Sequence, residues 1–91
     1  MIQTISITVR GKVQGVFFRQ SSRDKALQLG ITGWVKNLSD GSVSILASGN
    51  QQQLDEFLAW CRQGPPKAAV AGIDVQPHTA ESFKGFVILR F

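Results

Sequence analysis

The 91-residue chain has one cysteine, Cys61, one histidine, His78, and no tyrosine. One cysteine cannot form a disulfide bond within the chain, and one cysteine with one histidine cannot supply the ligands of a structural zinc site. No apolar run approaches the roughly 20 residues of a transmembrane helix. The N-terminus also lacks the basic segment and apolar block of a signal peptide. We therefore expect a cytoplasmic protein with no membrane partner and with no metal or other cofactor.

Acidic residues are also scarce, since 6 Asp and Glu residues face 10 Lys and Arg residues and leave a formal net charge of +4. A basic chain favours anionic partners, but net charge alone does not separate nucleic acids from small phosphates. The apolar fraction of 43% and the charged fraction of 18% are ordinary for a globular domain. At this length, we expect residues 1–91 to form one domain with a modest core, and to be a monomer.

The first third of the chain has the periodicity of a strand followed by a helix. Residues 4–10, T-I-S-I-T-V-R, alternate between polar and apolar, which predicts a strand with one face in the core and one face in water. Residues 19–29 carry small and apolar side chains near one stripe. Gly30 follows at the place where a helix commonly ends.

The middle of the chain predicts a β-hairpin over residues 31–48. Its first strand, residues 31–37, is followed by the turn-forming sequence S-D-G at residues 39–41, in which glycine can adopt a positive φ. Residues 42–48 then alternate again and place Val43, Ile45 and Ala47 on one face. The hairpin is therefore expected to bury one face only.

A second helix is predicted from Asn50, a favourable N-cap, because Gln53 can complete a capping box with it. Gly-Pro-Pro at residues 64–66 should end this helix, and two further strands are predicted near residues 69–76 and 83–90. The order is therefore β-α-β-β-α-β with an additional final strand. Because both helices have a single apolar face, we predict an antiparallel sheet with both helices on one face, a ferredoxin-like α+β sandwich.

A candidate anion site lies in residues 11–19, G-K-V-Q-G-V-F-F-R, between the first strand and the first helix. Gly11 and Gly15 give the loop conformational freedom, so that several N–H groups can converge on one anion next to a helix N-terminus. Arg19 adds a planar fork of donors that matches two phosphate oxygens. On the residues alone, an ordinary turn explains the pattern equally well. We also consider that the C-terminal carboxylate of Phe91 pairs with Arg19, if the last strand borders the hairpin.

A second candidate is Asn37, at the end of a predicted strand in G-W-V-K-N-L-S-D-G. Its side-chain amide both donates and accepts hydrogen bonds, so it can hold a water molecule in one orientation. Asparagine also commonly bonds to the backbone of its own turn. On the residues alone, this turn interpretation is the favoured one.

Three motifs together resemble the acylphosphatase family: G-x-V-Q-G-V-x-F-R, G-W-V-x-N-x-x-D-G and G-P-P-x-A. The resemblance covers nearly the whole chain, in the order and spacing of that family. It implies that Arg19 binds the phosphoryl group and that Asn37 orients the attacking water. It also implies a phosphate-binding loop made of Gln14, Gly15, Val16, Phe17 and Phe18, together with Arg19.

The resemblance implies a hydrolase that cleaves acyl phosphates, which are carboxyl–phosphate mixed anhydrides, into a carboxylate and inorganic phosphate. Inorganic phosphate should then be both product and inhibitor. The leaving carboxylate has a pKa of roughly 4.3, like a Glu side chain, and needs no general acid. Phosphoryl transfer mainly requires positioning and stabilisation of charge on the phosphoryl oxygens. The motifs therefore need no catalytic His or Cys, no paired carboxylates and no metal ion.

Two alternatives are an RNA-recognition-like module and a domain that binds small anions without turnover. The βαββαβ order also builds RNA-recognition modules. Residues 84–87, K-G-F-V, resemble part of their aromatic signature, but that signature belongs on the third strand. The predicted third strand, residues 42–48, contains no aromatic residue. We therefore favour a small-molecule substrate over nucleic acid.

Overall fold

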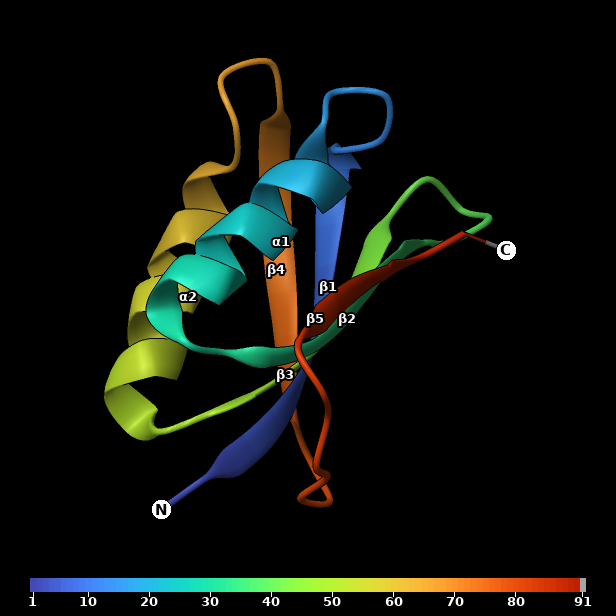
Figure 1. Cartoon of the computed structure of the whole chain (residues 1–91). Coiled ribbons are helices and arrows are strands. Elements are labelled where there is room, and N and C mark those ends of the chain that lie inside the picture. The colour runs from blue at the N-terminus through green and yellow to red at the C-terminus, as the bar shows by residue number, and fades with distance from the viewer. Residues whose placement is uncertain (91) are drawn as a thin grey trace.

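The computed structural model describes residues 1–90 and confirms the predicted order of elements, including the additional final strand (Figure 1). The first helix begins one residue earlier than predicted, and the fourth strand extends two residues further. The final strand is shorter than the predicted residues 83–90 at both ends. The elements are β1 (Gln3–Lys12), α1 (Phe18–Leu29), β2 (Thr32–Asn37), β3 (Val43–Gly49), α2 (Gln51–Gln63), β4 (Ala69–His78) and β5 (Phe86–Leu89).

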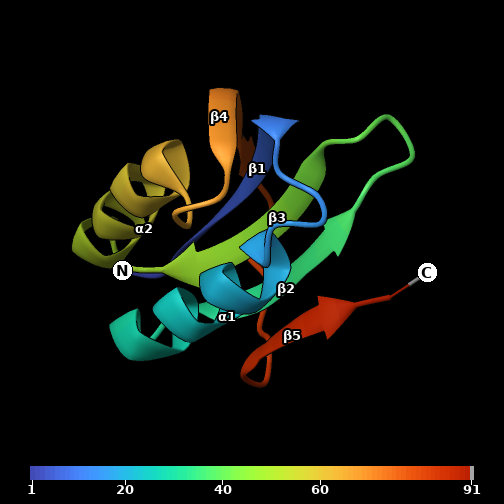
Figure 2. The same cartoon turned by 90° about the horizontal axis from the view of Figure 1, so that it is seen from above.

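The strands form one sheet in the order β4-β1-β3-β2-β5, and α1 and α2 lie side by side on one of its faces (Figures 1 and 2). This confirms the ferredoxin-like α+β fold. The pairs β1–β4, β1–β3 and β2–β3 are antiparallel, as predicted, whereas β5 pairs with β2 in parallel. The reason is geometric: β4 runs opposite to β2, and the chain reverses once more before β5 while it crosses to the other edge.

The alternating strands and the two single-faced helices enclose one apolar core. Cys61 lies in this core at 0% exposure, and burial raises the pKa of its thiol to about 12, so the thiol stays protonated at neutral pH. Aromatic rings link the helices to the sheet, because Trp60 contacts both Phe18 and Phe57, and Phe57 contacts Phe86. These contacts anchor Phe18, the first residue of α1, and therefore fix the position of the helix N-terminus.

The helix ends follow the predicted local chemistry. Asn50 Oδ1 accepts a hydrogen bond from Gln53 N at 2.8 Å, and Gln53 Oε1 accepts one from Asn50 N at 2.7 Å, which confirms the capping box. Gly30 ends α1 with φ +78°, and Gly64 ends α2 with φ +69°. Both values lie in the left-handed region that favours glycine.

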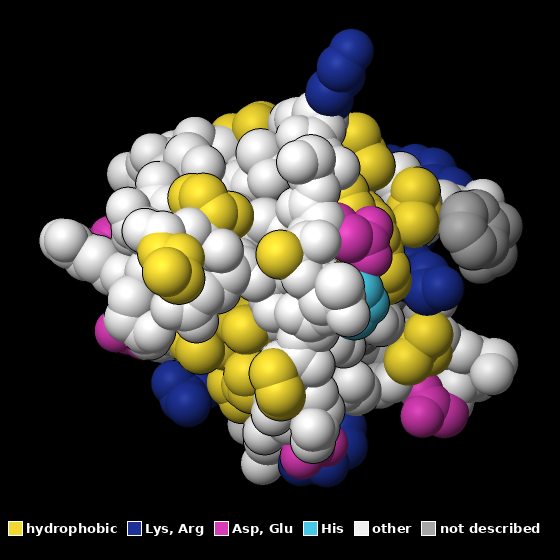
Figure 3. Space-filling view, turned by 90° about the horizontal axis from the view of Figure 1, so that it is seen from below, with side chains coloured by type: hydrophobic (Ala, Val, Ile, Leu, Met, Phe, Trp, Pro, Cys, Tyr) yellow, Lys and Arg dark blue, Asp and Glu magenta, His cyan; other side chains and the backbone are white. Residues whose placement is uncertain are grey.

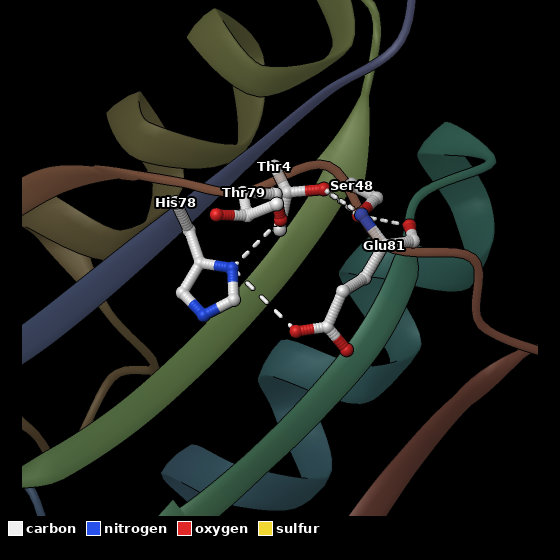
Figure 4. A network of polar contacts seen from close by, with 5 residues as sticks. All are labelled: Thr4, Ser48, His78, Thr79 and Glu81. Atoms are coloured by element: carbon white, nitrogen blue, oxygen red, sulfur yellow. Dashed lines mark hydrogen bonds and ion pairs between the residues drawn. The ribbon is translucent and has the colours of Figure 1, made fainter.

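The connection between β4 and β5 is tied to the sheet by a small polar network (Figure 4). Thr4 Oγ1 and Ser48 Oγ lie 2.6 Å apart, and Glu81 N donates to Thr4 Oγ1 at 3.1 Å. The polar face of β1 was expected to lie in water, but Thr4 is only 3% exposed because this connection covers it. His78, two residues beyond the predicted strand, ends β4, and its Nδ1 lies 2.8 Å from Thr79 O.

The end of the molecule that carries this connection has charges of both signs (Figure 3). Lys and Arg side chains lie apart from one another near the margin of this view, and Asp and Glu side chains are interspersed among them. Among the described residues in this view, the basic side chains therefore form no continuous surface. Within residues 1–90, no helix has the length and hydropathy needed to cross a membrane.

Candidate active site

The loop between β1 and α1 starts from a β-bulge, where the register of β1 against β4 shifts between Arg10 and Gly11. Gly11 has φ +122°, and a Cβ built on it would lie 2.2 Å from Ala69 O. Only glycine permits this approach of the two backbones, so the sequence of the loop fixes the direction in which the chain leaves the sheet. The next segment then turns toward the end of β2.

A cavity of about 320 Å³ opens where this loop meets the first turn of α1 and the ends of β2 and β5. It brings together every predicted site residue except Val16, whose side chain is 5% exposed and packs in the core. Only the main chain of Val16 can therefore face an anion. The lining residues are Val13, Gln14, Gly15, Phe17, Phe18, Arg19, Gln20, Asn37, Ile88 and Arg90.

Arg19 lies in the first turn of α1 and is half-buried at the wall of the cavity. Among residues 1–90, its guanidinium forms no ion pair and no hydrogen bond. The first turn of α1 contains no acidic residue, and the N-cap residue Phe17 provides no side-chain hydrogen bond. The N–H groups at this helix start thus lack a side-chain cap and, with the helix dipole, favour an anion.

Phe17 adopts a left-handed backbone conformation, with φ 64° and ψ 23°, and is the one non-glycine residue with positive φ in the described part of the chain. Such a conformation costs on the order of 1–3 kcal/mol and occurs mainly where the surrounding structure enforces it, often at functional sites. Phe17 is the N-cap residue of α1, so this conformation occurs where the loop joins the helix. We therefore infer that the surrounding structure holds the loop in this conformation.

Asn37 is the last residue of β2 and lines the cavity. Its Oδ1 atom is buried without a hydrogen-bond partner, and within residues 1–90 its side chain forms no hydrogen bond to the protein. The turn that follows is held instead by Asp40, whose Oδ1 accepts hydrogen bonds from Ser42 N at 2.9 Å and from Ser42 Oγ at 2.5 Å. The interpretation of Asn37 as a residue that bonds to its own turn is therefore wrong.

Hydrogen bonds from Ser42 lower the pKa of the Asp40 carboxyl. The hydroxyl group of Ser42 has the larger effect and its backbone N–H the smaller one. Because the folded pKa lies below the unfolded one, the ionised carboxylate stabilises the turn at neutral pH. This contribution is lost as the pH falls through the lowered pKa. The hairpin turn thus has its own stabilising residue, independent of Asn37.

Gln14 was predicted as part of the phosphate-binding loop, and its side chain connects that loop to the β2–β3 hairpin. Its Nε2 donates to Leu38 O at 2.8 Å and to Ser42 O at 2.9 Å. Both side-chain donors are thus engaged, which leaves the main chain of Gln14 to face the cavity. The bridge holds the two halves of the site, which carry Arg19 and Asn37, at a fixed separation.

Replacing Gln14 by alanine should lower the free energy of unfolding by about 1–3 kcal/mol, since two partly buried hydrogen bonds are lost at about 0.5–1.5 kcal/mol each. Urea unfolding measures this change. The matched control is Gln28→Ala, an exposed glutamine of α1 with no such contact, which should leave the urea midpoint near that of the parent. Equal midpoints for both variants and the parent would contradict the bridge.

Sequence reasoning did not identify Gln20, Ile88 or Arg90 as part of this cavity. Ile88 and Arg90 reach it because β5 pairs in parallel with β2, with Ile88 opposite Val35. The apolar C-terminal run F-V-I-L, followed by Arg90, signals a strand, but not the edge of the sheet that the strand joins. The proposed pairing of the Phe91 carboxylate with Arg19 lies outside the described residues. Within residues 1–90, no group of three or more His, Cys, Asp or Glu side chains is arranged to hold a metal ion.

Comparisons with known proteins point in one direction. The Acylphosphatase family model matches residues 5–88 of the chain. A protein from Methylococcus capsulatus named acylphosphatase is 46% identical over 90 residues, which covers 98% of each chain. The structure of an acylphosphatase from Coxiella burnetii superposes with a TM-score of 0.93 at 43% identity, covering 97% of this chain and 93% of that one. An acylphosphatase from Bacillus subtilis also gives a TM-score of 0.93, at 36% identity, covering 99% of this chain and 100% of the other.

Proposed function

The chain belongs to the acylphosphatase family, and from this premise we propose that Arg19 and Asn37 are the residues that carry out its reaction. The enzyme hydrolyses acyl phosphates to a carboxylate and inorganic phosphate. The observation that carries the proposal concerns residues 1–90: one cavity brings together a guanidinium and a side-chain amide that form no hydrogen bond to these residues, and a helix start without a side-chain cap. These are a cation, anion-binding N–H groups and a group that can orient water.

Arg19 binds the phosphoryl group in this proposal. Its planar fork donates to two of the phosphoryl oxygens, and the main-chain N–H groups from Gln14 to Phe18 surround the third. The positive end of the α1 dipole adds to the same field. Because negative charge is spread over these oxygens in the transition state, donors fixed around them lower the barrier without moving during the reaction.

Asn37 orients the attacking water. Its amide stands at the end of β2, where it makes no hydrogen bond to the described part of the protein, and it can donate to and accept from one water molecule. The water then attacks phosphorus in line with the departing carboxylate, and a phosphoryl oxygen of the substrate takes its proton. Gln14 keeps Asn37 at the correct distance from Arg19, through its hydrogen bonds to the hairpin.

The leaving group explains why this set of residues suffices. A carboxylate leaves as a stable anion, since its conjugate acid has a pKa of roughly 4.3, and so no side chain has to protonate it. The cation and N–H groups of the site provide the stabilisation of phosphoryl charge that a metal ion gives in other phosphoryl-transfer enzymes. We therefore propose that the reaction is independent of metal ions.

The test is phosphate release from benzoyl phosphate or acetyl phosphate, measured with excess EDTA and again with added Mg²⁺. We expect the same rate in both conditions. Activity that EDTA abolishes and Mg²⁺ restores would show that the residues named here are not the complete site. The absence of phosphate release in both conditions would overturn the assignment of Arg19 and Asn37 to this reaction.

Inorganic phosphate is expected to inhibit competitively and to stabilise the fold, because it occupies the same binding site as the phosphoryl group. A ligand that binds only the folded state adds about 2.7 kcal/mol to the free energy of unfolding at one hundred times its Kd. Thermal unfolding with phosphate, and with sodium chloride at matched ionic strength, separates binding from general salt effects. An unchanged Tm at saturating phosphate would be evidence against an anion-binding site in this cavity.

We further propose that the protein acts as a single cytoplasmic domain over residues 1–91, as a monomer, on a small-molecule acyl phosphate, without nucleic-acid or membrane partners. An RNA-recognition module needs aromatic residues on its third strand, and β3, V-S-I-L-A-S-G, has none. The charges of both signs at the end of the molecule seen in Figure 3 also argue against a nucleic-acid surface there.

A further inference from the structure

Phe17 combines two unusual properties at the edge of the cavity. Its side chain is 67% exposed, although a phenyl ring is among the most costly groups to leave in water. Its backbone is left-handed, with φ 64°, although this region disfavours residues with a Cβ. Other apolar side chains within residues 1–90 are also exposed, but Phe17 alone among them lies at the cavity that holds Arg19 and Asn37.

The neighbours of Phe17 explain how the ring is kept out of the core. Val16 and Phe18 are 5% and 1% exposed, so the residues before and after Phe17 are both anchored in the apolar interior. Phe18 also contacts Trp60, with ring centroids 5.4 Å apart. Phe17 itself lies on the exposed side of the loop and is among the residues that line the cavity.

The cavity consequently has two chemically different parts. Arg19, Arg90 and Asn37 supply cationic and polar groups, whereas Phe17 and Ile88 supply apolar surface. Ile88 is half-buried and packs against the core, so it is a fixed wall. An acyl phosphate also has two chemically different parts, because a charged phosphoryl group is joined to an acyl group of variable size.

We propose that the ring of Phe17 binds the acyl group of the substrate, so that the enzyme prefers acyl phosphates with aromatic or other large apolar acyl groups. The inference rests on the proposed function, in which Arg19 and the loop hold the phosphoryl group and so place the acyl group toward the open side of the cavity. Contact with the ring removes apolar surface of both partners from water, and an aromatic acyl group gains from ring stacking as well. Acetyl phosphate, with one methyl group, gains little from it.

The test compares kcat/KM for benzoyl phosphate and acetyl phosphate in the parent, Phe17→Asn, Phe17→Leu and Phe17→Trp. Asparagine removes the ring and tolerates the left-handed backbone conformation. We expect Phe17→Asn to lower kcat/KM for benzoyl phosphate by about fivefold to tenfold more than kcat/KM for acetyl phosphate, mainly through KM, because any effect on the phosphate-binding loop is common to both substrates. This difference corresponds to about 1–1.4 kcal/mol. Phe17→Trp should keep the preference of the parent, and Phe17→Leu should fall between.

The Ki of inorganic phosphate is measured on every variant, because phosphate occupies the charged part of the cavity alone. A fall in the ratio of benzoyl to acetyl activity in Phe17→Asn that is larger than any change in Ki supports the proposal. Equal losses on both substrates would overturn it, since they would mean that the ring only shapes the loop. An unchanged ratio in Phe17→Asn, with full activity, would also overturn it while leaving Arg19 and Asn37 in place. A parent that hydrolyses neither substrate would overturn the proposed function and this inference together.

Discussion

Arg19→Lys should lower kcat/KM for benzoyl phosphate by about a hundredfold, although the positive charge is kept. Lysine is a point charge on a flexible stem, and it cannot reproduce the planar fork that donates to two phosphoryl oxygens at once. The loss of one fixed donor in a charged transition state costs on the order of 10²–10³ in rate. The larger part of the effect should appear in kcat, since a single ammonium can still attract the phosphoryl group in the ground state.

The fold should tolerate this substitution, because in the described part of the chain the Arg19 guanidinium forms no hydrogen bond or ion pair that lysine would lose. The matched control is Arg23→Lys, one turn further along α1, where the guanidinium lies 3.6 Å from Asp24 Oδ1 outside the cavity. Urea midpoints of both variants should stay near that of the parent. Activity of Arg19→Lys within about threefold of the parent would rule out the two-oxygen clamp.

Asn37→Ala should lower kcat by about 10²–10³ while the Ki of inorganic phosphate stays within about twofold of the parent value. The separation is expected because Arg19 and the loop bind phosphate, whereas Asn37 acts on the attacking water. Stability should stay near that of the parent. The Asn37 side chain forms no hydrogen bond to the described residues, so alanine removes no such contact within this part of the protein.

The control for this prediction is Asp40→Ala, three residues along the chain. Asp40 holds the turn through Ser42, so this variant should be less stable than the parent and should retain its kcat in the molecules that remain folded. Asn37→Ala is thus expected to lower kcat without lowering stability, and Asp40→Ala to lower stability without lowering kcat. A destabilised, fully active Asn37→Ala variant would instead mean that another residue orients the water.

The elements of this fold were predictable because their signals are local. The capping box at Asn50 and Gln53, the glycine at position 30 and the alternation of β1 each depend on residues a few positions apart. The parallel pairing of β5 was not predictable in this way. It depends on which edge of the sheet remains open after the other strands have paired, and that is decided by contacts between distant segments.

The candidate site was also predictable only where its signals are local in the sequence. The sequence motifs identified Arg19 and Asn37, which the structure places in one cavity, and the loop around Gly15. They gave no indication of Arg90, which reaches the cavity only through the position of β5. The role of the Gln14 side chain was also hidden, because its two acceptors are backbone carbonyl groups of the hairpin, which carry no residue-specific signal.

The placement of β5 has a consequence for the kinetics of folding. The cavity needs walls from the loop after β1, from the end of β2 and from β5, which are the beginning, middle and end of the chain. The last of these is a four-residue edge strand, and its pairing with β2 joins distant segments of the chain, such as Gly33 and Phe86. Contacts between distant segments form slowly, because the entropy of loop closure is spent before they are made. Recovery of enzymatic activity during refolding should therefore lag behind the recovery of helical structure, and the active site is complete only when the entire chain has folded.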